Sequence, residues 1–381
     1  MRARLKFLLS AAAVLLCLSG CQNITSPETG GIDPLSPEKI SPEDPSSQHG
    51  AEPSNAIDED ESLPPRDGMA RSRLTNEWVD EKVAQTRPIA VLIPNEAHAT
   101  PHYNLSKASI VYEAKVEGSM TRLMAIYEDW QKLNKIGNVR SARRYFAYWA
   151  LEWDSIIVHF GGPYFAYEVL DEATTDNVDG TYDSTAFFRT SDREQPHNAY
   201  ASGPGILEAV KKNQFSLEYR GLTEDHHFLF ADQSTPNTLT QYGENAKEAT
   251  YIDMTAAYPL TRCYFDYNPE DQLYYRSQYL SGSTDGPHID GYTDKQLCFS
   301  NVIVQRVKQE DLGNGYLAMQ CHDTTRDGWY FTRGKGIHVT WEKIGDYGAT
   351  RYFDDNGDEV KMNMGKTMIL IIRDSDNFNF R

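Results

Sequence analysis

The chain has 381 residues, of which 40% are hydrophobic, and its formal net charge is −18. This length is enough for two ordinary domains after a leader and a linker are set aside. A surface with such a negative charge repels nucleic acid and anionic polymers, so we expect no nucleic-acid partner.

The N-terminus has the order of a lipoprotein export signal. Basic residues open the chain, and the apolar stretch that follows, residues 7–18, is too short to span a membrane as a stable helix. Two small residues then precede Cys21, whose thiol is the place where a diacylglyceryl group is attached before cleavage. We therefore predict a signal peptide over residues 1–20, acylation of Cys21 with palmitate-like chains, and a lipid anchor on the outer, extracytoplasmic face of the cell membrane.

The next segment, residues 21–80, has the composition of a disordered tether. It is rich in proline, serine and acidic residues, including the run Asp58–Glu61. Such a segment cannot bury enough apolar surface to fold, and its prolines and like charges keep it extended. We expect it to lift the folded part of the chain away from the membrane into the cell envelope.

Residues 81–248 show a mixture of strand and helix patterns, which favours an N-terminal mixed α/β domain and an α+β chain. The strands are expected over residues 87–93, 109–117, 122–128 and 155–160, and the helices over residues 142–153, 164–172 and 203–213.

Residues 249–381 change to short alternating runs separated by glycine, Asp and Asn, which predicts a smaller all-β domain, a barrel or a sandwich. Strands are expected over residues 263–267, 272–275, 301–305, 315–321, 328–333, 336–341, 349–353 and 367–372, and a hairpin turn over residues 355–358.

Three cysteines fall in this last part: Cys263, Cys298 and Cys321. They allow either one disulfide with one remaining thiol or three reduced side chains. Because they lack the paired spacing of a zinc site, and no cofactor motif is recognisable, we expect neither a metal nor a cofactor.

Arginines gather in the N-terminal domain. Arg140, Arg143 and Arg144 lie on a loop that enters a helix, and Arg122 lies on a nearby strand. Paired guanidinium groups suit carboxylate or phosphate recognition. The alternative is that they form salt bridges with acidic residues of the same domain, of which Glu113, Glu117 and Asp154 are candidates.

Two histidines could belong to the same site. His159 stands near the carboxyl end of an apolar strand, before Gly161 and Gly162, where ligands gather in open α/β sheets. His197 and Asn198 open the loop before the last helix. The alternative for His159 is a histidine held by hydrogen bonds beneath the glycine turn.

Several motifs, in one order along residues 87–372, resemble the YerB-like lipoproteins. They are Arg87–Asn95, Ile110–Gly118, Thr121–Leu123, Val139–Arg143, Val158–Gly162, Phe188–Arg189, Pro196–Tyr200, Gly334–Gly336, Thr340–Lys343, Tyr352–Gly357 and Met364–Thr367. The resemblance implies an N-terminal domain of unknown function followed by a separate C-terminal domain. It carries over no established biochemical activity. Arg144 departs from the family, which tends to have proline there, and makes the loop more basic.

These observations leave two classes of function. The first is an envelope protein that binds an anionic ligand, such as a cell-wall fragment or a carboxylate of a partner protein, in a cleft made by Arg122, Arg140, Arg143, His159, His197 and Asn198. The second is an envelope hydrolase in which His159, His197 and Glu117 act as acid and base. We favour binding, because no nucleophile is recognisable in the sequence.

Overall fold

The computed structural model describes residues 66–224, 226–280 and 285–381. Cys21, the predicted signal peptide and residues 21–65 lie outside the described residues, so the lipidation site is not seen. Contacts place all of the described residues in one compact unit.

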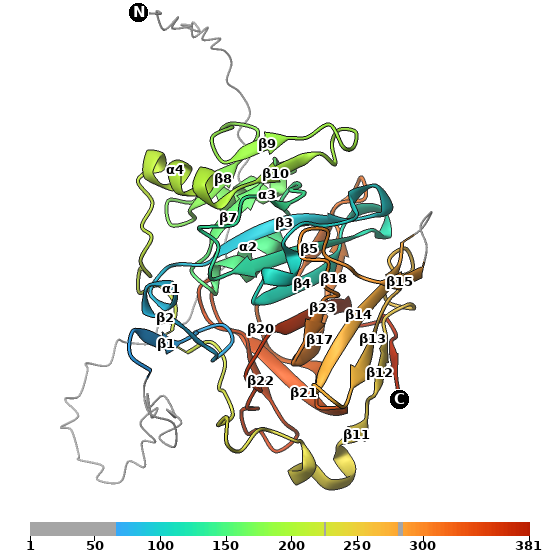
Figure 1. Ribbon diagram of the computed structural model, residues 1–381. Helices are drawn as coiled ribbons and strands as arrows, with labels where there is room; N and C mark the ends of the chain where they lie inside the picture. The colour runs from blue at the N-terminus through green and yellow to red at the C-terminus, as the bar shows by residue number, and fades with distance from the viewer. Residues whose placement is uncertain (1–65, 225, 281–284) are drawn as a thin grey trace, which may run out of the picture. The chain divides into compact units, whose positions relative to one another are not determined.

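The largest element is a sheet of eleven strands (Figure 1), in the order β11-β21-β20-β17-β23-β4-β5-β3-β7-β8, with β22 paired to β21. Its strands are β3 (Ile89–Asn95), β4 (Ile110–Lys115), β5 (Thr121–Tyr127), β7 (Ile156–His159), β8 (Asn177–Asp179), β11 (Lys247–Glu248), β17 (Asn301–Val307), β20 (Asp323–Thr332), β21 (Lys335–Lys343), β22 (Arg351–Phe353) and β23 (Thr367–Arg373).

The sheet joins the two parts of the chain that the sequence separates. The late strand β23 lies between β17 and β4 and runs parallel to both, with Thr367 opposite Asn301 on one side and opposite Ile110 on the other. On β23, six of the seven residues are buried. Continuous apolar strands of this kind are typical of sheets that are covered on both faces.

Helices and a second sheet cover the two faces. Of the four α-helices among the described residues, α2 (Arg144–Leu151) and α3 (Tyr164–Leu170) share one core with Ile157 and Ile371, whereas α4 (Gly203–Asn213) belongs to the core of the opposite face; the short α1 spans Glu81–Ala84. The 3-10 turns span Ala97–Ala99, Leu105–Lys107, Glu117–Ser119 and Thr240–Asn245.

The second sheet has six strands and shares the core of α4, through Phe265 and Tyr274. Its strands are β12 (Tyr251–Asp253), β13 (Cys263–Asn268), β14 (Leu273–Tyr279), β15 (Asp285–Pro287), β16 (Cys298–Phe299) and β24 (Asn379–Phe380). The smaller sheets are formed by β1 (Met69–Arg71) with β2 (Trp78–Asp80), by β6 (Ile136–Gly137), β9 (Phe187–Arg189) and β10 (Ala199–Ala201), and by β18 (Gln309–Asp311) with β19 (Leu317–Met319).

Strands predominate over helices, so the prediction of an α+β chain is confirmed only in part. The C-terminal strands form no separate barrel or sandwich, since some of them complete the large sheet and others make the second one. Folded structure also begins before the predicted boundary at residue 81, because β1 and β2 lie in the segment that we assigned to the tether. The open question about the cysteines is answered: Cys263, Cys298 and Cys321 form no disulfide.

Candidate functional site

The loop that carries the arginines is fixed by backbone hydrogen bonds to three strands. Arg140 N donates to Leu92 O of β3 at 2.8 Å, and Phe160 N, just after β7, donates to Arg140 O at 3.0 Å. Val139 N donates to Ala199 O of β10 at 2.8 Å. The arginine side chains therefore project from a rigid segment at the ends of the central strands.

Arg122, on β5, is buried beneath this loop. Its Nη1 donates to Ser141 O at 2.6 Å, but its Nε has no hydrogen-bond partner, and it forms no ion pair with a described carboxylate. Burial, and then the charges of Arg143 and Arg140, lower the pKa of Arg122 to about 9. The side chain is still a cation at neutral pH, so a positive charge is held here without a direct ion pair, and the carboxylate of Glu117 acts on it only from a distance.

Arg140 is half-buried, and its Nε also lacks a partner. Burial lowers the pKa of Arg140. The carboxylate of Glu96 raises that pKa, and the charges of Arg143 and Arg189 lower it further. Like Arg122, Arg140 forms no ion pair with the described carboxylates, since Glu96 acts on it only from a distance.

Arg143 is neutralised, unlike its neighbours. Its Nε donates to Glu117 Oε1 at 2.6 Å and its Nη2 pairs with Glu117 Oε2. Burial works to raise the pKa of Glu117, but the hydrogen bond and charge of Arg143 outweigh it and lower that pKa. The salt-bridge alternative is thus correct for Arg143 and Glu117, whereas Glu113 pairs with Arg276 and Asp154 with Arg87 and Arg220.

His197 borders Arg140. Its ring stacks on His98 with a centroid distance of 6.0 Å, and its Nδ1 lies 3.7 Å from Glu96 Oε1. Burial lowers the pKa of His197 against the opposing effect of Glu96, and the charge of Arg140 lowers it further. We name Arg122, Arg140, Arg143 and His197 the basic cluster.

Both polar atoms of the Asn198 side chain are engaged in hydrogen bonds within the protein. The side chain is buried; its Oδ1 accepts from Arg189 Nη1 at 2.8 Å and its Nδ2 donates to Thr190 O at 2.8 Å. Asn198 therefore positions Arg189, which the sequence alone did not place next to Arg140.

His159 does not join the basic cluster, contrary to our prediction. It is fully buried, with Nδ1 2.9 Å from Gly161 O and Nε2 3.1 Å from Asn177 Oδ1. Neighbouring strand residues face opposite sides of a sheet, so His159 follows Ile157 into the core beneath α3, and Val158 faces the other core. The alternative, a structural histidine held at the glycine turn, describes it.

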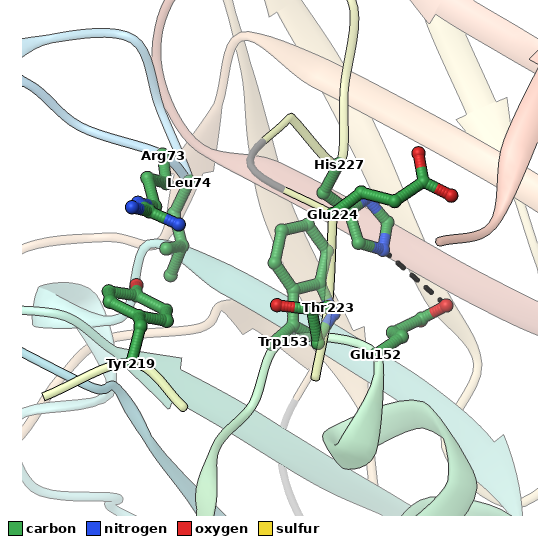
Figure 2. A pocket seen from close by; sticks show the side chains of 8 residues that line it. All are labelled: Arg73, Leu74, Glu152, Trp153, Tyr219, Thr223, Glu224 and His227. Carbon is green, nitrogen blue, oxygen red and sulfur yellow. Dashed lines mark ion pairs between the residues drawn. The ribbon is translucent and has the colours of Figure 1, made fainter. Parts of the chain in front are cut away.

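A second group of polar side chains surrounds a small cavity near the end of α2 (Figure 2). Glu152 and His227 face each other there, with Oε2 and Nε2 3.4 Å apart, and the His227 ring stacks on Trp153 at 3.5 Å. Burial works against the charge of Glu152, but Lys343 and His227 outweigh it and lower the pKa to about 2.

The cavity offers about 10 Å³ for a water-sized molecule, which is room for one water. Lys343 Nζ lies 3.5 Å from Glu152 Oε2, and the hydroxyl of Tyr112 donates to Oε1 at 2.5 Å. These contacts tie α2 to β4 and β21, so the group has a structural role. No local sequence pattern reveals this group, because Glu152 and Lys343 lie nearly 200 residues apart and His227 lies between them.

The chain matches two models of a protein family of unknown function. The model of the DUF3048 N-terminal domain covers residues 74–216, and that of the DUF3048 C-terminal domain covers residues 253–369. The chain belongs to this two-domain family, the YerB-like proteins.

One relative is YerB of Bacillus subtilis (strain 168), whose name designates it provisionally as a lipoprotein. It is 27% identical over 318 residues, which are 83% of this chain and 90% of the relative. The crystal structure of the YerB protein from Bacillus subtilis has a TM-score of 0.68 and 26% identity, over 81% of this chain and 99% of that one. In the part of the chain that the structure describes, no helix is both long and apolar enough to cross a membrane.

Proposed function

We propose that the chain is a lipid-anchored, extracytoplasmic lipoprotein of the cell envelope that binds an anionic ligand through the basic cluster. The anchor is supported by the signal order before Cys21 and by the name of the Bacillus subtilis relative. The ligand is an envelope component or the carboxylate of a partner protein. Nucleic acid does not fit a chain with a net charge of −18.

The observation that carries the proposal is the set of unpaired donors. Arg122 Nε and Arg140 Nε are buried atoms without a hydrogen-bond partner, whereas Arg143 pairs with Glu117 and His197 Nδ1 lies 3.7 Å from Glu96 Oε1. Each buried, unsatisfied donor costs on the order of 1–3 kcal/mol. A carboxylate or phosphate brought against these groups would satisfy them and offset the repulsion between the two arginines.

The helix that follows adds to the positive potential. α2 has eight residues and begins directly after Arg143; no side chain caps its first turn and no acidic residue lies in it. The N-terminal end of a helix carries a partial positive charge. The guanidinium groups and the helix end are both positive, so they are complementary to an anion.

The hydrolase alternative finds no support in this geometry. Glu117 is held as an ion pair with a lowered pKa, which makes it a weak general acid. His159 is buried with both ring nitrogens facing oxygen atoms, away from His197. The three residues proposed for acid and base therefore do not form one catalytic set.

Calorimetric titration of the full-length chain with citrate, and separately with inorganic phosphate, tests the proposal. Replacing Arg140→Gln removes an unpaired guanidinium, so the dissociation constant should rise about 10-fold or more, as expected for a lost charge-assisted hydrogen bond. Arg144→Gln is the matched control, because its guanidinium already pairs with Glu168 at 2.9 Å. The control should change affinity by less than about twofold, since the remaining effect is a screened surface charge. Equal affinities for the Arg140→Gln variant and the unaltered chain would refute the site.

The anchor has its own test. Cys21→Ala removes the only thiol that the signal order offers for acylation, so labelled palmitate should no longer be incorporated and the chain should lose its stable membrane attachment. Cys298→Ala, which removes a half-exposed thiol of the folded part, is the control and should leave labelling unchanged. Labelling that persists in the Cys21→Ala cells would show that the anchor lies elsewhere.

A further inference from the structure

We infer that the anion is carried on a sugar chain: the ligand of the basic cluster is a carboxylated oligosaccharide whose rings stack on the phenol rings of Tyr164 and Tyr182. This inference rests on the proposed function, because the arginines supply the partner for the carboxylate. The inference adds the sugar rings, which are the part of the ligand that the arginines do not bind.

The two tyrosines stand on segments that are hydrogen-bonded to the arginine loop. Ala142, two residues after Arg140, donates its backbone N–H to the carbonyl oxygen of Gly161 at 2.9 Å. Gly161 in turn lies three residues before Tyr164. Gly161 N donates to Asp179 Oδ1 at 2.8 Å, and Tyr182 N donates to Asp179 O at 3.1 Å. The loop after β7 is thus clamped between the arginine loop on one side and the turn that carries Tyr182 on the other.

Both side chains are far more exposed than aromatic residues ordinarily are. Tyr164 keeps 78% of its surface accessible and Tyr182 keeps 83%, although the backbone beneath each is fixed. Gly161 turns the chain here with a φ of +74°, which glycine adopts without strain. Exposed aromatic rings on a fixed backbone, here the first residue of α3 and a hydrogen-bonded turn, lose little conformational entropy on binding, which suits them to receive a flat, partly apolar partner.

The exposed side chains of this part of the chain favour a sugar over a folded protein. Within residues 140–200 every exposed large hydrophobic side chain is aromatic: Tyr164, Tyr182 and Phe188. Arg189, beside Arg140, lies over the ring of Phe160 at 4.8 Å and extends the same mixture of guanidinium and aromatic groups. A protein interface instead needs an apolar core that excludes water. A sugar ring presents an apolar C–H face to a phenol ring and hydroxyl groups to solvent, and a carboxylate on it meets the unpaired arginine donors.

The test uses three ligands of the full-length chain, measured by calorimetric titration. The first is a tetrasaccharide of alternating N-acetylglucosamine and N-acetylmuramic acid, which carries lactyl carboxylates. The second is chitotetraose, which has a related backbone without the carboxylates, and the third is tetraglutamate, which has carboxylates without sugar rings. The carboxylated tetrasaccharide should bind more tightly than either of the others, by about fivefold or more.

The variants separate the two parts of the site. Tyr164→Ala combined with Tyr182→Ala should weaken the carboxylated tetrasaccharide about 10-fold, as expected for two lost aromatic contacts. Tyr292→Ala removes another tyrosine, 56% exposed, and should have no effect. Because the replaced side chains are exposed, circular dichroism should show an unchanged fold.

The outcomes distinguish the inference from the proposed function. If the tyrosine variant binds normally while Arg140→Gln still weakens binding, the sugar assignment fails and the anion site stands. If tetraglutamate binds most tightly, the ligand is an acidic peptide and the sugar assignment again fails. If Arg140→Gln leaves all three affinities unchanged, the anion site itself is wrong.

Discussion

At the scale of single residues, the sequence indicates which side chains are unusual but not which of them meet. Arg122, Arg140, Arg143 and His197 are linked by their charges: Arg143 and Arg140 act on the pKa of Arg122, and Arg140 acts on that of His197. His159 does not join them, because one step along a strand reverses the face that a side chain occupies, and the sequence does not show which face of β7 belongs to the loop. Glu96, whose carboxylate favours the charged form of Arg140, follows β3 directly and could have been found as a polar residue at a strand end.

Glu128 offers a test of burial at this scale. It follows β5, its side chain is buried with Oε1 unpaired, and burial raises its pKa to about 7. The folded chain therefore holds this proton more tightly than the unfolded chain, so the stabilising contribution is complete below pH 4.5 and is lost as the pH rises through 7.

Glu128→Gln should remove this loss. At pH 8 the variant should be more stable than the unaltered chain by about 1–3 kcal/mol, and at pH 5 the difference should be much smaller. Asp129→Asn changes the exposed neighbouring carboxylate and should leave stability within about 0.5 kcal/mol. Urea denaturation at the two pH values measures both, and a variant that is less stable at pH 8 would contradict the assignment.

At the scale of elements, the central strands and helices could be predicted from their apolar periodicity, and α4 spans the residues 203–213 that its spacing indicates. The short strands β8, β9 and β10 could not, because three residues carry too little pattern. The ion pair that joins the two sheets was also out of reach: Glu113 of β4 and Arg276 of β14 lie 2.8 Å apart, both almost fully buried. Nothing local in the sequence links positions so far apart.

This pair should be costly to break from one side. Arg276→Met leaves the carboxylate of Glu113 buried without its cation, so the free energy of unfolding should fall by about 3–5 kcal/mol. Adding Glu113→Gln removes the stranded charge, and part of the loss should return. Urea denaturation of the single and double variants measures the coupling. A loss below about 1 kcal/mol in the single variant would mean that the pair does not hold the sheets together.

At the scale of the whole molecule, the two family segments share one sheet. The C-terminal strand β23 is one of the two strands that pair with β4. One edge of β4 therefore lacks its backbone hydrogen bonds until the end of the chain is in place. The composition change near residue 249 suggests a domain boundary, but a parallel pairing between distant strands leaves no local signal in the sequence. The fold could therefore be predicted strand by strand, whereas the way the strands join could not.

A continuous sheet predicts cooperative unfolding. Differential scanning calorimetry of the full-length chain should show one transition, with the calorimetric and van't Hoff enthalpies in agreement. Ile369→Asp, which places a charge on the buried middle of β23, should lower the stability of the whole unit rather than of one half. Two separate transitions, of which the variant affects only one, would show that the family segments fold independently.

If Arg122 and Arg140 hold guanidinium groups ready for an anion, nuclear magnetic resonance of the full-length chain with ¹⁵N-labelled arginine should detect the bound anion at both side chains. The Arg140→Gln and Arg122→Gln variants assign the two Nε signals, and citrate is the probe. Both signals should move in a saturable titration, while the signal of Arg220, whose Nε already donates to Asp154 Oδ1 at 2.8 Å, should stay in place. Signals of Arg122 and Arg140 that do not respond to citrate would contradict the anion site.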